Sequence, residues 1–180
     1  MRIENEKAAA LIIDFQEKLF PHIFENTVVQ KNVSRLIEGL KILHIPILVT
    51  EQYPKGLGST IMPLKNILPG IESFEKISFS CCDDNDVMNA IQKLKRNFII
   101  IAGIEAHVCV LQTVIDLIYT GFTPVVVTDC ISSRKEIDKV FAIERIKKEG
   151  AILVTYESVL FELCRVAGSE KFKSISAIVK

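Results

Sequence analysis

The sequence has no excess of charge of either sign, because 22 Lys and Arg residues balance 22 Asp and Glu residues in a chain of 180. Such a chain has no bulk electrostatic field that would draw it to nucleic acid or to an anionic membrane, so we expect neither as a partner. Long apolar runs are also missing, and none approaches the roughly 20 residues that a membrane-spanning helix needs.

Cysteine-pairing patterns are absent as well. The five cysteines are odd in number and form no C-x-x-C arrangement: Cys81, Cys82, Cys109, Cys130 and Cys164. This argues against a disulfide framework and against a zinc finger. Residues 1–7 are charged and lead directly into an apolar stretch, without the features of a secretory signal. Because free thiols persist best in a reducing compartment, we expect a cytoplasmic protein.

Short apolar runs alternate with helical patterns along the chain. Six segments are predicted as strands: residues 8–14, 45–50, 74–79, 97–104, 123–128 and 151–156. Apolar residues at three- and four-residue spacing predict helices over residues 29–43, 87–94, 109–119, 135–149 and 158–166. This alternation predicts one α/β domain over residues 1–180, a three-layer, doubly wound, Rossmann-like fold with a six-stranded parallel sheet.

The common strand order of such a sheet is 3-2-1-4-5-6, and we expect it here. Its topological switch lies between the first and fourth strands, and ligands bind outside their carboxyl ends. Asp14 ends the first predicted strand and Cys109 follows the fourth. Residues 51–69 are rich in Pro and Gly and predict a long loop, a feature that is usually functional in compact domains.

Cys109 is the candidate nucleophile. It lies near the start of a predicted helix, where amide N–H groups and the helix dipole favour a thiolate. The alternative is a small buried core residue. We expect Cys130 and Cys164 to be structural, and Cys81 and Cys82 to lie near the mouth of the crevice.

Asp14 and Lys76 are candidate partners of this thiol. A carboxylate at the end of an apolar strand needs a partner when it is buried, and a thiol and a lysine would serve. Lys76 lies inside the third predicted strand, where an ammonium at the sheet's end would keep Asp14 ionised and favour the thiolate. The alternatives are a loop-ordering Asp14 and a solubilising edge-strand lysine.

Three segments resemble those of the isochorismatase-like cysteine hydrolases: LIIDFQ around Asp14, FEKISFS around Lys76 and GIEAHVCVLQT around Cys109. With TEQYPKGLGST at residues 50–60, they look most similar to uncharacterised bacterial hydrolases and animal isochorismatase domain-containing proteins. The resemblance covers nearly the whole chain in order and spacing. It implies an Asp14-Lys76-Cys109 triad, a cis peptide between Ile104 and Glu105, and an oxyanion hole formed by the backbone N–H groups of Glu105 and Cys109.

The implied activity is hydrolysis of a small amide through a thioester, without a cofactor. We expect Phe15, Gln52 and Tyr53 to bind the substrate. Nicotinamidases of this superfamily hold a metal through an Asp-x-His pair and a later His, whereas the loop here begins Glu51-Gln52-Tyr53 and contains no histidine. We therefore predict no catalytic metal and disfavour nicotinamidase. True isochorismatases act on a vinyl ether and lack the nucleophilic cysteine, so their activity is not carried over.

Other interpretations stay open. His107 precedes Cys109 by two residues, but side chains so placed on a turn usually point apart, which disfavours a Cys-His pair. The chain could be a binding or scaffold protein with vestigial chemistry, or a redox sensor using a low-pKa Cys109. We also expect a homo-oligomer, because the family commonly assembles and several apolar residues need burial: Leu57, Ile61, Met62, Ile175, Ile178 and Val179.

Overall fold

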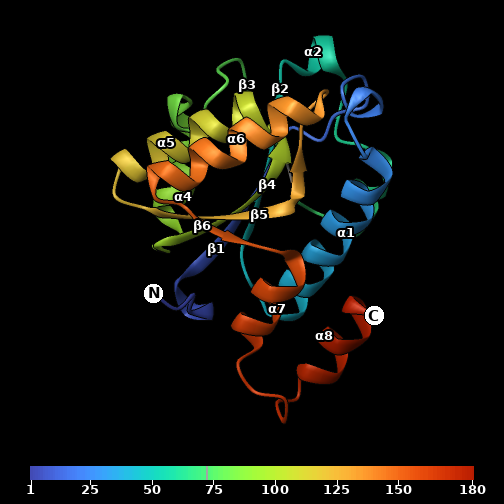
Figure 1. Cartoon of the computed structure of the whole chain (residues 1–180), viewed down its shortest axis with the longest axis vertical. Coiled ribbons are helices and arrows are strands. Elements are labelled where there is room, and N and C mark those ends of the chain that lie inside the picture. Colours follow the sequence, from blue (N-terminus) through green and yellow to red (C-terminus); the bar gives the residue numbers. More distant parts are fainter. Residues whose placement is uncertain (72) are drawn as a thin grey trace.

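A computed structural model describes residues 1–71 and 73–180, and its centre is a parallel sheet (Figure 1). The strands are β1 (Ala8–Ile13), β2 (Ile47–Gln52), β3 (Ser73–Lys76), β4 (Phe98–Ile104), β5 (Thr123–Ser132) and β6 (Ile152–Val154). Their order is β3-β2-β1-β4-β5-β6, and every neighbouring pair is parallel. The predicted fold class and strand order are confirmed.

Helices cover both faces of the sheet. The helices are α1 (Asn26–Ile42), α2 (Pro54–Leu57), α3 (Met62–Ile67), α4 (Asn85–Lys93), α5 (Leu111–Tyr119), α6 (Glu136–Glu149), α7 (Tyr156–Cys164) and α8 (Phe172–Val179). One core cluster lies under α1, α3, α7 and α8, and a second lies under α4, α5 and α6. Figure 1 shows α1 on one side of the sheet and α4 to α6 on the other.

The central strand β1 explains why the sequence begins with a continuous apolar run. Ala8, Ala10 and Ile12 belong to the α1 core, whereas Ala9, Leu11 and Ile13 belong to the core under α5. Since side chains alternate across a strand, both faces must be apolar when helices cover both. Full burial of a side chain such as Ile or Leu contributes about 1.5–3 kcal/mol.

The third strand is shorter than predicted. It ends at Lys76 rather than at Phe79, and Ile77 is 74% exposed. The carbonyls of Ser78 and Phe79 instead accept hydrogen bonds from the buried Lys76 ammonium. The chain therefore leaves the sheet here because these carbonyls solvate the lysine.

The predicted loop over residues 51–69 contains two short helices, α2 and α3. Each has a proline in its first turn, Pro54 and Pro63, where the missing N–H has no intrahelical partner to lose. A further helix that the sequence did not predict, α8, places Ile175 in the core under α1. Ile61 and Ile175 are thus buried within their own chain.

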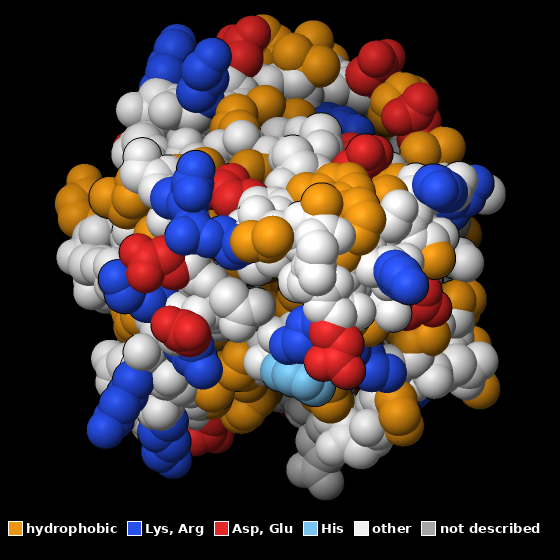
Figure 2. Space-filling model, turned by 90° about the horizontal axis from the view of Figure 1, so that it is seen from below, with side chains coloured by type: hydrophobic (Ala, Val, Ile, Leu, Met, Phe, Trp, Pro, Cys, Tyr) orange, Lys and Arg blue, Asp and Glu red, His pale blue; other side chains and the backbone are white. Residues whose placement is uncertain are grey.

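The surface carries charges of both signs. Figure 2 shows acidic and basic side chains interspersed over the end of the molecule that lies lowest in Figure 1, near α7 and α8. Within the described ranges, no helix is both long enough and apolar enough to cross a membrane.

Candidate active site

The parallel sheet brings several polar residues to one edge. Asp14 follows β1, Gln52 and Lys76 end β2 and β3 in register with each other, and Glu105 follows β4. Because all strands are parallel, their carboxyl ends meet at the same edge. This is the topological switch region that the strand order predicted.

Asp14 and Lys76 form a buried ion pair. The Lys76 Nζ lies 2.7 Å from Asp14 Oδ2, and their side chains are 0% and 1% exposed. The ammonium also donates to the carbonyls of Ser78 and Phe79, at 3.1 and 3.2 Å, so all three of its N–H groups have acceptors. Desolvation lowers the pKa of Lys76, but the charge of the Asp14 carboxylate and its hydrogen bond to the ammonium oppose this, and the pKa is raised.

The backbone conformation of Asp14 fixes its carboxylate in this position. Its φ of 57° lies in the left-handed region, which Asp tolerates better than most residues. Its N–H donates to the Thr50 carbonyl, and the Thr50 hydroxyl donates to Asp14 Oδ1 at 2.7 Å. Both carboxylate oxygens thus have donors.

Cys109 lies beside this pair within a π-helical turn, Ala106–Val110, that precedes α5. It is 3% exposed, and its thiol donates to Gln52 Oε1 at 3.6 Å. Burial raises the pKa of Cys109, and the Asp14 carboxylate raises it further, while Lys76 lowers it. Cys109 lies near the start of a helix, as predicted, but burial outweighs the effect of the ammonium on its pKa, which opposes the predicted thiolate.

Cys81 belongs to the same region, although the sequence placed it only near the crevice mouth. It is fully buried, and its Sγ lies 3.9 Å from the Thr50 hydroxyl. Desolvation raises the pKa of Cys81 to about 11, against the opposing effect of Lys76. All five cysteines are free.

A cavity of about 310 Å³ opens onto Cys109. Its lining consists of Leu19, Gln52, Leu57, Phe79, Glu105, Val108, Cys109 and Arg134. Gln52 lines this cavity, whereas Tyr53 is 52% exposed and is not part of the lining. Phe15 is 1% exposed and packs on Phe20 in the core under α1, so its predicted substrate contact is wrong. The turn at Asp14 directs Phe15 into that core.

Five lining residues were missed from the sequence: Leu19, Leu57, Phe79, Val108 and Arg134. They lie in segments that follow the strands. These segments have no periodic pattern from which one could predict which side chains point into the cavity. Among these five residues, only Phe79 could have been selected from the sequence, because it is an apolar residue in the segment around Lys76.

The turn before Cys109 is fixed by Glu105. The peptide bond between Ile104 and Glu105 is cis. Glu105 is buried, and its Oε1 accepts from the backbone N–H and from the Nε of Arg134, both at 3.0 Å. His107 is hydrogen-bonded through Nδ1 to the Ser133 hydroxyl at 2.9 Å and is not part of the cavity lining.

Gln16 connects β1 to the loop that borders the cavity. This fully buried side chain donates from Nε2 to the carbonyls of Gln52 and Gly58, at 2.9 and 2.7 Å. Its Oε1 accepts from the Gln52 N–H at 2.7 Å. Gln16 thus fixes the start of the segment that carries Leu57, a role with no signature in the sequence.

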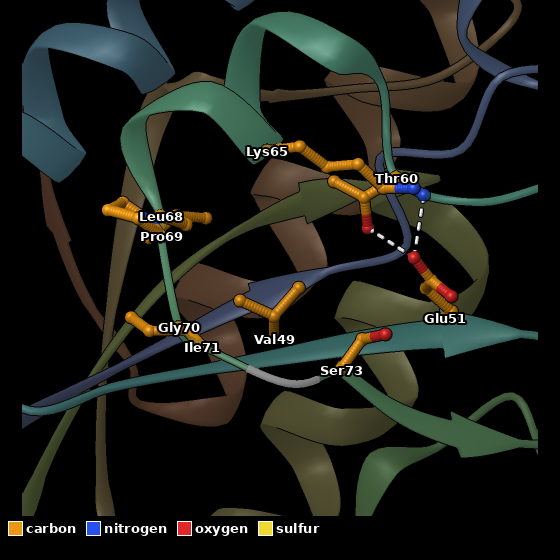
Figure 3. Close-up of a pocket in the computed structure, with 9 residues that line it drawn as sticks. All are labelled: Val49, Glu51, Thr60, Lys65, Leu68, Pro69, Gly70, Ile71 and Ser73. Atoms are coloured by element: carbon orange, nitrogen blue, oxygen red, sulfur yellow. Dashed lines mark hydrogen bonds between the residues drawn. The ribbon is translucent and has the colours of Figure 1, made fainter.

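A second cavity, of about 230 Å³, lies on the opposite side of β2, because Val49 and Glu51 alternate with Thr50 and Gln52. Figure 3 shows its most buried charged residue, Glu51, turned toward Thr60. Glu51 Oε1 accepts from the N–H and hydroxyl of Thr60 at 2.6 and 2.7 Å. These bonds fix the connection between α2 and α3, so we assign this region a structural role.

Comparisons with known proteins agree with the observed fold. The isochorismatase domain family matches residues 8–158. The chain therefore belongs to the isochorismatase domain family, whose members are generally hydrolases. Isochorismatase family protein 1B from Dictyostelium discoideum is 38% identical over 184 residues, covering 99% of this chain and 89% of that protein.

Two solved structures are similar to the chain over nearly its whole length. The MAR1 ribonuclease from Caenorhabditis elegans has a TM-score of 0.94 and 38% identity, with 99% of this chain and 92% of that chain covered. The YcaC gene product from Escherichia coli, described as an octameric hydrolase of unknown specificity, has a TM-score of 0.93 and 26% identity, with 99% and 90% covered.

Proposed function

We propose that the chain is a metal-independent cysteine amidohydrolase that cleaves the C–N bond of a small amide through a thioester on Cys109. The observation that carries this proposal is the buried 2.7 Å pair of Asp14 and Lys76 beside a thiol that opens onto a cavity. A buried ion pair is expensive to desolvate and is weak evidence for stability alone. Its position next to a nucleophile supports a chemical role.

Asp14 is the general base of the proposed first step. The raised pKa of Cys109 means that the resting residue is a thiol, so its proton must leave as the sulfur attacks. Asp14 accepts this proton while an S–C bond forms to the carbonyl carbon. Lys76 keeps Asp14 ionised, and it cannot itself act as base because its pKa is raised and its three N–H groups are engaged.

The oxygen of the tetrahedral intermediate needs donors, and we assign the backbone N–H groups of Glu105 and Cys109 to it. Asp14 then returns the proton to the nitrogen, the C–N bond breaks and the amine leaves. Water gives a proton to Asp14 and attacks the thioester. The S–C bond breaks, the proton returns to Cys109, and a carboxylic acid leaves.

The proposed chemistry uses no cofactor and no metal ion. The Glu51 carboxylate, at the start of the loop that holds the metal ligands in nicotinamidases, faces away from the Cys109 cavity and accepts hydrogen bonds from Thr60. Among residues 1–71 and 73–180, no group of three His, Cys, Asp or Glu side chains is placed to hold an ion. The three side chains of the proposed triad supply base, cation and nucleophile themselves.

Two alternatives from the sequence receive less support. A scaffold protein with vestigial chemistry would be favoured by a crevice plugged with its own side chains, whereas Cys109 lines an open cavity. A redox sensor needs a thiol of low pKa, and burial raises the pKa of Cys109.

We propose a small molecule, not RNA, as substrate, although the Caenorhabditis elegans relative is a ribonuclease. Balanced total charge supports this, as do four apolar residues in the cavity lining, namely Leu19, Leu57, Phe79 and Val108. Incubation of labelled single-stranded RNA with the wild type and with Cys109→Ala tests it. Cleavage that depends on Cys109 would overturn this assignment.

We further propose that residues 1–180 form one domain that assembles into a homo-oligomer in the cytoplasm. Two core clusters that share one sheet support the single domain. The octameric Escherichia coli structure supports assembly, as do three exposed apolar residues on α6, namely Ile137, Val140 and Phe141. The five free thiols support a reducing compartment.

The proposed reaction is tested by screening small amides for release of ammonia or amine, with Cys109→Ala and Cys130→Ala as a matched pair. Both cysteines are buried, but Cys130 lies in the core under α1 and is not part of the cavity lining. We expect Cys109→Ala alone to abolish turnover, and mass spectrometry to find the acyl group on Cys109. Full turnover by Cys109→Ala would refute the proposal.

A further inference from the structure

The second cavity, on the face of β2 opposite to the candidate active site, has a buried acidic residue that the proposed reaction does not use. Its volume is about 230 Å³, below the range of about 300–1,000 Å³ that is usual for drug-sized ligands. Figure 3 shows Leu68 and Pro69 on one side of this space and Glu51 on the other. Glu51 and Leu68 are each 6% exposed, whereas Ile71 is 37% exposed. The cavity therefore has a buried floor and room for a small molecule.

The structural role of Glu51 uses only one of its two carboxylate oxygens. Oε1 accepts from the N–H and the hydroxyl of Thr60, at 2.6 and 2.7 Å. Among the residues that the structure describes, none donates a hydrogen bond to Oε2, and no ion pair includes this carboxylate. Since no fully buried side-chain oxygen in the described part of the chain lacks a partner, Oε2 is accessible to solvent. A donor on an incoming molecule can therefore bind it.

A second carboxylate adds negative charge to this face of the sheet. Glu51 of β2 and Glu75 of β3 are register partners on neighbouring strands, which lie about 4.8 Å apart. Phe74 packs in the core under α4 to α6, so the alternating Glu75 projects from the same face as Glu51. Glu75 is exposed, and no ion pair of the described residues includes it. The two carboxylates repel each other, and a cation beside them would relieve this repulsion.

The lysine in the cavity lining does not supply this cation. Lys65 is exposed, and its Nζ donates to the Ser59 hydroxyl at 2.7 Å rather than to Glu51. A metal ion is not suited either, because Mg²⁺ and Ca²⁺ take about six or more oxygen ligands, and the described ranges contain no cluster of three ligating side chains. Apolar residues border the cavity and suit a hydrocarbon group attached to the cation: Val49, Leu68, Pro69 and Ile71.

We infer that this cavity is a binding site for small aliphatic ammonium compounds. The ammonium group donates to Glu51 Oε2, and the hydrocarbon part lies against Val49, Leu68 and Ile71. An alkylamine is charged at neutral pH, as is lysine, whose ordinary pKa is about 10.4. The inference does not depend on the proposed function, because none of these four residues lines the Cys109 cavity.

The test compares 3-methylbutylamine with 3-methylbutan-1-ol, which share a carbon skeleton and differ in charge. Titration of the ¹⁵N-labelled protein, followed by the NMR shifts of its amides, gives the affinity and the location of binding. We expect the amine to shift the Thr60 and Ser73 amides saturably. It should bind about tenfold or more tighter than the alcohol, the size of a charge-assisted hydrogen bond. Equal affinities would overturn the inference, as would shifts centred on Val108 and Arg134, which line the other cavity.

Glu51→Gln and Glu38→Gln form a matched pair of variants. The Glu51→Gln change keeps an oxygen that accepts from Thr60 but removes the charge. Glu38 is exposed on α1 and does not line the cavity. We expect Glu51→Gln to weaken binding of the amine by about tenfold or more, and Glu38→Gln to leave it within about twofold, as for a screened surface charge. Full affinity in Glu51→Gln would overturn the inference, as would equal losses in both variants.

Glu75→Gln gives a measurement that leaves the buried carboxylate intact. At 10 mM salt, this change should weaken binding of the amine by about threefold, as for charges about 6 Å apart in water. The loss should disappear at 1 M salt, where the Debye length falls from about 30 to about 3 Å. Unchanged affinity in Glu75→Gln at low salt would overturn the claim that the two carboxylates together recruit the cation.

Discussion

Replacement of Lys76 by Met provides the sharpest test of the buried pair, because Met has a similar length and leaves little empty space. The change leaves the Asp14 carboxylate buried at 1% exposure without a cationic partner, although the Thr50 hydroxyl still donates to it. Removing one member of a buried pair typically costs about 3–5 kcal/mol. With a urea slope of about 2–3 kcal/mol per molar, the unfolding midpoint should fall by about 1–2 M.

A double-mutant cycle separates the interaction energy between Asp14 and Lys76 from the interactions of each residue with other groups. In the double variant Asp14→Asn, Lys76→Met, no buried charge is left alone, so we expect it to lose about 2–3 kcal/mol less than the sum of the single losses. Lys65→Met serves as control, because Lys65 is exposed and bonded only to the Ser59 hydroxyl. Its effect should stay within about 0.5 kcal/mol.

The pH dependence of this stabilisation has a definite sign. The folded pKa of Lys76 is raised above its ordinary value of 10.5, so its contribution is fully present below pH 10.5 and is lost as pH rises through the higher folded value. Urea titrations at neutral pH give the coupling. Single losses that simply add, within about 0.5 kcal/mol, would refute the claim that Asp14 and Lys76 act as a pair.

Three further predictions concern the site. Because burial and Asp14 raise the pKa of Cys109, its alkylation by iodoacetamide should be slow at neutral pH and should become faster only in alkaline solution. Asp14→Asn should speed this alkylation, and Lys76→Met should slow it. Fast labelling of Cys109 at pH 6 would contradict this prediction. Gln16→Leu should cost about 1–3 kcal/mol in urea unfolding and should increase hydrogen exchange around Leu57, since it removes the three hydrogen bonds of a buried side chain. Increased exchange confined to β1 would argue against a role of Gln16 in holding the loop. Amide hydrolysis should persist after prolonged treatment with a chelator, and activity that returns only with added Zn²⁺ would exclude the metal-independent scheme.

Local patterns in the sequence predicted most of the fold. β1 and β4 are buried on both faces, so their apolar runs report the parallel sheet directly. Asp14 and Lys76 were identifiable because a charge in such a run needs a partner. The end of β3 was not predictable, because Ile77 and Phe79 are apolar residues typical of a strand. In the structure both are exposed, and the carbonyls of Ser78 and Phe79 accept hydrogen bonds from the Lys76 ammonium.

The cavity lining was predicted less well than the buried pair of Asp14 and Lys76. Phe15 and Tyr53 were chosen because they adjoin Asp14 and Gln52 in sequence, but positive φ angles at Asp14 and Tyr53 redirect the chain there. Arg134 is 29 residues from Glu105 in the chain, and only the tertiary fold joins them. The pKa of Cys109 could not be predicted either, because burial of the π-helical turn decides its direction.

The division between sheet and loops has a consequence for how this protein can change. Asp14 and Lys76 are fixed by β1, β2 and β3, whereas Leu19, Leu57 and Phe79 belong to segments outside the strands. Substitutions at Leu57 and Phe79 can alter the shape of the cavity while leaving the buried pair and both cores intact, whereas Leu19 also packs against the core under α1. Descendants of one ancestral chain could thus acquire new substrates through a few loop changes, without passing through unstable intermediates.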